Sequence, residues 1–235
     1  MANNSYAGTG TSLSSSFYLR NFYTSNRDAR TSSKRKSMDN TDLTLADGQA
    51  LRRAIRQLEK SEFSETDDTN VRSSVLAFID TYNNTLSSTS SSGDHTLERN
   101  MKQLKSLTQE YAKELDKIGI TVNDDGTLTS RESLFGSADI SKFQKLFSSD
   151  SDYMQRTASY AKRIERRSEA LGISAKTQEL KEIAANKADS QTDDSSIAAI
   201  ATLSSTSTTV AQIVAASTNL DETDSSIGQN VDIVL

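Results

Sequence analysis

The sequence has no cysteine and no proline among its 235 residues, and its only histidine is His95. Without cysteine the chain cannot form a disulfide, a thiolate metal site or a cysteine nucleophile, and a single histidine excludes paired-histidine metal motifs. Proline breaks helix interiors, so its absence is compatible with long helices. No phosphate-binding loop, nucleophile motif or metal cluster is visible. We therefore expect no enzyme activity, no cofactor and no metal.

Apolar residues are also scarce: 34% of the chain is hydrophobic, 6% is aromatic, and there is no tryptophan. A chain this polar cannot bury enough apolar surface along its whole length to offset the entropy of folding. We expect a mainly α-helical protein with a modest core, a disordered N-terminal segment and a weakly structured C-terminal tail. No apolar run approaches the roughly 20 residues of a membrane-spanning helix. Met1 to Arg20 lacks the apolar stretch of a secretory signal.

Charge is unevenly distributed along the chain. Residues 1–38 carry six basic residues and one acid, whereas the whole chain has a net charge of −5. The run Lys34-Arg35-Lys36 has the composition of a nucleic-acid-binding arm. It leads into an acidic body that would repel phosphate, so we interpret it as a solvated segment and expect no nucleic-acid partner.

Composition predicts three parts. Residues 1–46 form a basic, Ser/Thr/Asn-rich disordered lead-in, residues 47–190 form a helical domain, and residues 191–235 form a Ser/Thr-rich tail that is helical only with a partner. Within the domain, apolar spacing predicts helices over 47–58, 70–86, 96–118, 139–147 and from 152 to a glycine cap at Gly172. The stretch from 195 to 216 has weaker helical spacing and belongs to the conditional tail.

Two of these helices repeat apolar residues in alternating steps of four and three. Such a heptad seam requires a partner helix, either within the chain or from another subunit. Thr108 is the only polar position in the first seam. We predict that the seams mediate interaction through Leu97, Met101, Leu104, Tyr111, Leu115, Ile118, Tyr153, Tyr160 and Ile164.

The stretch 118–135, IGITVNDDGTLTSRESLF, allows two interpretations. Residues 121–132 have the length of a calcium-binding loop with glycine at its sixth position, but Thr121 occupies the first ligand position, which normally supplies a carboxylate. The alternative is an antiparallel hairpin over 118–130 with a turn at NDDG. Thr129 and Glu132 would then form a capping box for the following helix. We favour the hairpin.

Three pieces of sequence together resemble one known family. They are VRSSVLAFIDTYNNTL (71–86), LDKIGITVNDDGTLTSRESLF (115–135) and ISKFQKLFSSD (140–150). With these motifs in this order, residues of about 71–168 resemble the C-terminal core of the bacterial flagellar filament-capping protein, also called hook-associated protein 2. The family's β-rich outer domains should precede this core, and only 70 residues are available there.

The resemblance implies a structural protein of the bacterial flagellum, exported without a cleavable signal peptide and located outside the cell. The partners it implies are the protein itself, flagellin or proteins of the hook–filament junction. A second hypothesis is an intracellular, cytoplasmic helical module that binds other proteins, with a degenerate calcium site at 121–132. Two observations discriminate between them: where the protein resides in a flagellated cell, and whether calcium binds.

Overall fold

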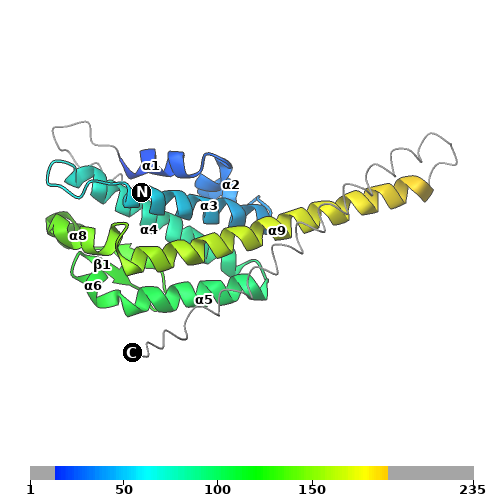
Figure 1. Ribbon diagram of the computed structural model, residues 1–235. Helices are drawn as coiled ribbons and strands as arrows, with labels where there is room; N and C mark the ends of the chain where they lie inside the picture. Colours follow the sequence, from blue (N-terminus) through cyan, green and yellow to red (C-terminus); the bar gives the residue numbers. More distant parts are fainter. Residues whose placement is uncertain (1–13, 190–235) are drawn as a thin grey trace, which may run out of the picture. The chain divides into compact units, whose positions relative to one another are not determined.

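In the computed structural model, residues 14–189 are described, and most of them are helical (Figure 1). The elements follow in the order α1 (Ser15–Phe22), η1 (Asp28–Arg30), α2 (Ser32–Arg35), α3 (Asn40–Glu59), α4 (Asp68–Ser90), α5 (His95–Glu110), α6 (Ala112–Asp116), β1 (Ile120–Val122), β2 (Leu128–Ser130), α7 (Glu132–Ser137), α8 (Ile140–Phe147) and α9 (Asp152–Asp189). The chain divides into two compact units, residues 1–169 and 170–235. The expected mainly helical fold with one hairpin is confirmed.

Helices α3 and α4 form the most extensive helix contact of the first unit. Both bury small side chains, which lets helix backbones approach closely: α3 contributes three alanines, and α4 contributes serines and threonines. The buried hydroxyls bond to carbonyl oxygens of their own helix, as Thr85 does with Thr81 at 2.8 Å. Thr44 also reaches across to the carbonyl oxygen of Ser88 at 3.2 Å. These bonds satisfy polar groups that would be costly to bury alone.

The N-terminal helices correct the expected disordered lead-in over 1–46. Figure 1 shows α1 beside α3, and α1 also contacts α4. Tyr18, Phe22 and Tyr23 are buried, so the aromatic cluster of this segment is part of the core. Helix α3 begins before residue 47 because the side chain of Asp39 caps it, accepting a bond from the Thr41 amide at 2.7 Å. Residues 1–13 lie outside the described part.

Three other helix boundaries differ from those expected. The predicted helix 96–118 is broken at Tyr111, which separates α5 from α6. The glycine at 172 does not end α9, which continues to Asp189. A glycine inside a helix costs only about 1 kcal/mol relative to alanine, which the flanking turns can offset. Helix α4 extends through the serine-rich stretch to Ser90. The tail predicted over 191–235 lies outside the described residues.

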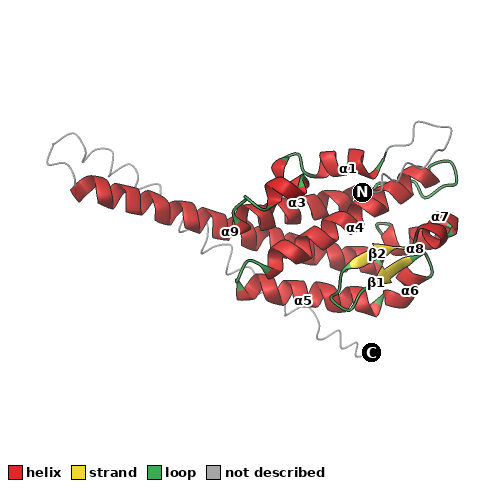
Figure 2. Cartoon of the chain, turned by 180° about the vertical axis from the view of Figure 1, so that it is seen from behind, coloured by secondary structure: helices red, strands yellow, loops and turns green. Residues whose placement is uncertain are grey.

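The predicted hairpin is present (Figure 2). Strands β1 and β2 are antiparallel, with Ile120 opposite Ser130 and Val122 opposite Leu128. Gly126 supplies the positive φ of the turn, +82°. The predicted capping box is wrong, because Thr129 pairs within β2 and no side chain caps the start of α7.

An aromatic cluster marks where α4, α7, α8 and α9 meet. The ring centroids of Phe78 and Phe147 are 5.6 Å apart, and those of Phe135 and Phe143 are 5.2 Å apart. Tyr153 continues the cluster from α9, 6.3 Å from Phe147. Within the described residues, no helix combines the length and apolarity needed to cross a bilayer.

Candidate functional site

The heptad-seam residues predicted to mediate interaction lie in two environments. Tyr111 and Tyr160 are half-buried. The other seven are buried, with at most 7% of each residue exposed: Leu97, Met101, Leu104, Leu115, Ile118, Tyr153 and Ile164. Their partners are other elements of the first unit. These seven residues therefore pack within the chain, which is one of the two alternatives left open for the seams, and they are not exposed for contact with another subunit.

The polar position of the first seam has a defined role in this core. The Tyr82 hydroxyl donates to Thr108 Oγ1 at 3.0 Å, and the Tyr153 hydroxyl lies 3.5 Å from the same oxygen. Burial raises the pKa of Tyr82 above its ordinary value and raises that of Tyr153 to about 12. Thr108 therefore provides a hydrogen-bond partner for the hydroxyls of two buried tyrosines, one from α4 and one from α9.

Three consecutive residues of α4 join it to three other parts of the chain, and we call them the Tyr-Asn-Asn junction (Tyr82, Asn83 and Asn84). Tyr82 bonds to α5, as described above. Asn83 pairs with the backbone of Leu128 in β2: its Nδ2 donates to the carbonyl oxygen and its Oδ1 accepts from the amide, both at 2.8 Å. Asn84 Nδ2 donates to the Tyr23 hydroxyl at 3.0 Å. Successive helical residues point about 100° apart, so three neighbours can face three directions.

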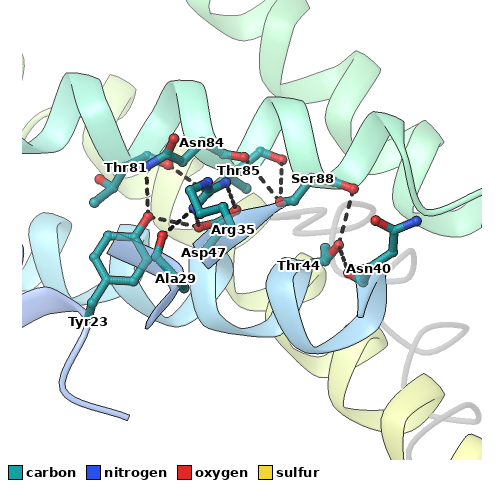
Figure 3. Close-up of polar contacts among 10 residues, drawn as sticks. All are labelled: Tyr23, Ala29, Arg35, Asn40, Thr44, Asp47, Thr81, Asn84, Thr85 and Ser88. Atoms are coloured by element: carbon teal, nitrogen blue, oxygen red, sulfur yellow. Dashed lines mark hydrogen bonds and ion pairs between the residues drawn. The ribbon is translucent and has the colours of Figure 1, made fainter. Parts of the chain in front are cut away.

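A buried ion pair holds the N-terminal segment to this junction (Figure 3). The side chain of Asp47 is 0% exposed. Arg35 donates to both of its oxygens, at 2.7 and 2.8 Å, and Tyr23 donates to Oδ1 at 2.8 Å. Arg35 also donates to the carbonyl oxygen of Ala29 at 2.7 Å. The expectation that the whole Lys34-Arg35-Lys36 run is solvated is therefore wrong for Arg35.

The surroundings of this ion pair shift the acidities of its members. Burial is the largest factor raising the pKa of Tyr23, and the neighbouring Asp47 charge raises it further. For Arg35, burial lowers the pKa, but the bonds and charge of Asp47 outweigh it, so the pKa is raised. Both side chains therefore keep their protons, and the ion pair acts as a structural staple.

Arg72 makes a second staple, between α4 and the α7–α8 region. Its guanidinium donates to the carbonyl oxygens of Phe135 and Ala138, the latter at 2.6 Å. It also lies 4.8 Å from the centroid of the Phe143 ring, within the range of a cation–π contact. These contacts satisfy carbonyl groups at the end of α7, where helices leave such groups without partners.

Two residues of the candidate calcium loop 121–132, Asn123 and Asp125, bond within the hairpin. Asn123 Nδ2 donates to Thr127 and Thr129, each at 2.8 Å. Asp125 Oδ1 accepts from the amide and the hydroxyl of Thr127, and these bonds lower the pKa of Asp125. In residues 14–189, no group of three or more His, Asp or Glu side chains could hold a metal ion. Calcium binding at 121–132 stays a hypothesis for calorimetry.

Large exposed apolar side chains are few in the described residues: Leu134 in the first unit, and Leu180 and Ile183 in the second.

No family model, no curated protein and no solved structure matches this chain.

Proposed function

We propose that this protein is a flagellum-associated structural protein of the filament-cap type, located outside the cell and acting through protein–protein contacts. Its proposed partners are further copies of itself, flagellin or proteins of the hook–filament junction. It acts by presenting a stapled helical module, and we propose no catalytic role for it.

One observation carries the proposal: the three sequence pieces that resemble the cap core form a single structural unit. Asn83, from the first piece, bonds to Leu128, from the second. Arg72, also from the first, lies over the ring of Phe143, from the third. These contacts between the pieces support treating the resemblance as one module.

The glycine of the IGI motif supports the same interpretation. Gly119 has a φ of +77°, and a Cβ added there would collide with the backbone at Leu134 and Phe135. The amide of Arg131 donates to the Gly119 carbonyl oxygen at 2.6 Å. The "IGI" and "SLF" ends of the second piece therefore pack directly against each other, and this close packing explains why the motif has a glycine at position 119.

Cell fractionation tests the proposal. Flagellated cells of the source organism, carrying an epitope-tagged chromosomal copy, are sheared and separated into filament and cell fractions. We expect the protein in the filament fraction, and we expect its deletion to impair filament assembly and motility. Complementation with wild type should restore both, whereas Asn83→Ala, which detaches β2 from α4, should restore them poorly. Gln103→Ala, which removes an exposed amide on α5, is the matched control.

Retention of all protein in the cytoplasm, with filaments and motility unchanged by deletion, would remove the proposal. The intracellular binding module would then be the better hypothesis. Its calcium component is tested by calorimetry and a melting scan with and without calcium. If calcium produces no heat of binding and no shift in Tm, that component is removed.

A further inference from the structure

A cleft of about 300 Å³ lies between α3 and the first half of α9, within the unit of residues 1–169. Ile55 and Ala158 give it an apolar lining. Its polar lining comes from both helices: Arg52, Arg56, Glu59, Gln155, Ser159 and Lys162. The cleft therefore combines a small apolar surface with several groups able to bond a charged ligand.

The charge of this cleft is predominantly positive. Arg52 is paired with Glu165, whereas Arg56 and Lys162 are exposed and have no ion-pair partner among residues 14–189. Glu59 is the only acid in the lining, which also holds Arg52, Arg56 and Lys162. An anionic ligand would pair with the two cations that have no partner.

The sequence holds the opposite charge in its last 46 residues. Residues 190–235 contain six acids and no lysine or arginine, which leaves 26 acids and 27 bases for residues 1–189. Four of the six acids lie in 217–235: Asp221, Glu222, Asp224 and Asp232. Leu220 and Ile227 stand among them. This segment offers carboxylates and apolar side chains together, as the cleft requires.

We propose that the cleft binds the acidic segment 217–235 of a second copy of the chain. Carboxylates of the segment would face Arg56 and Lys162, and one of its apolar side chains would lie against Ala158, which is half-buried. The contact joins unlike surfaces, so successive copies can add head to tail. This inference rests on the self-association that the proposed function includes, and it names the surface and the segment responsible.

A charge-swap experiment on the full chain tests this contact. The cleft variant carries Arg56→Glu and Lys162→Glu, and the segment variant carries Asp221→Lys, Glu222→Lys and Asp224→Lys. Analytical ultracentrifugation at low salt should show that wild type associates and that either variant alone associates at least about tenfold more weakly, since two exposed ion pairs are worth about 1.4 kcal/mol. Mixing the two variants should restore association. Raising the salt concentration should weaken it.

The control variant, Lys102→Glu with Lys117→Glu, makes the same charge change at two exposed lysines outside the cleft and should associate like wild type. The inference is overturned if the mixed variants remain monomeric, if the control weakens association equally, or if wild type is monomeric at low salt. Far-UV circular dichroism checks that each variant is folded.

A peptide of residues 217–235 keeps the inference testable if the cleft variant does not fold. Fluorescence anisotropy should show the labelled peptide binding to the full-length wild-type chain, and a peptide with Asn and Gln in place of its acids should bind at least about tenfold more weakly. Equal binding of both peptides, or no binding, would refute the charge-based contact. These assays use purified protein, so their failure would leave the flagellar location, tested by fractionation, unaffected.

Discussion

Replacing Arg35 by methionine should destabilise the protein by about 3 kcal/mol or more, because it leaves a buried carboxylate without its cation. Breaking one partner of a buried ion pair typically costs about 3–5 kcal/mol. Arg35 supplies two of the three hydrogen bonds described to Asp47, whose side chain is 0% exposed. The Tyr23 hydroxyl keeps one bond, so we expect the lower part of that range. Methionine retains most of the apolar stem, which isolates the charge as the cause.

Urea unfolding followed by far-UV circular dichroism measures this loss, and the adjacent lysine provides a matched control. Lys34 pairs with Asp28 at 2.6 Å, but the two side chains are 59% and 57% exposed. Lys34→Met should therefore cost less than about 1 kcal/mol. The double variant Arg35→Met/Asp47→Leu, which removes both charges, should recover at least half of the stability lost by Arg35→Met. If the two single variants unfold at the same urea concentration, the reasoning is refuted.

Three further predictions concern the hairpin, its contact with α4 and the buried tyrosines. Gly119→Ala should destabilise the protein by several kcal/mol, because the φ of Gly119 is positive and a Cβ there would meet backbone atoms. Its control, Gly136→Ala, has nothing within 4 Å of the added Cβ and should be neutral or stabilising by up to about 1 kcal/mol. Equal melting temperatures of the two variants would contradict this. Asn83→Ala should lower the free energy of unfolding by about 1–3 kcal/mol, because two backbone groups of Leu128 lose their partner. Hydrogen exchange should show loss of protection at the Leu128 amide. Unchanged protection there would contradict this prediction. The pKa of Tyr153 is about 12 in the folded chain and about 10 in the unfolded chain. The contribution of Tyr153 to the free energy of unfolding is therefore fully present below pH 10 and is lost as the pH rises through 12. That loss is on the order of 3 kcal/mol. Tyrosinate absorbance should show some of the seven tyrosines ionising only as the far-UV signal disappears. Complete ionisation of a chain that is still folded would argue against burial.

The elements that sequence predicted well are those set by local chemistry. The NDDG turn with its flanking β-branched residues determines a hairpin by itself, and the spacing around Phe78 determines the buried face of α4. The capping box failed because its threonine had a stronger alternative. The Arg131 amide bonds back to Gly119, which extends the pairing beyond β2. Residues 129–131 therefore continue the strand pairing and do not cap α7, because Arg131 bonds to a residue twelve positions earlier in the sequence.

The ion pair of the N-terminal segment could not be predicted, because its members are far apart in sequence. Asp47 is separated by 12 residues from Arg35 and by 24 from Tyr23. One signal was available: Asp47 stands on the apolar face of α3, at the helical spacing of Ala50, Leu51 and Ala54. An acid in that position must find a buried cation or donor. The sequence does not indicate which of the basic residues before it is the partner.

The scarcity of apolar residues did not indicate how the fold completes its core. Polar side chains do so by bonding to one another, as Tyr82 and Thr108 do, or to backbone groups, as Asn83 does with β2. Each such bond contributes only about 1 kcal/mol, yet an unsatisfied buried group costs more than that. Alternative packings of α4 against α5 and the hairpin are therefore penalised more strongly than in a purely apolar core. For a protein proposed to present fixed surfaces to its neighbours in an assembly, this selection of one packing arrangement matters more than total stability.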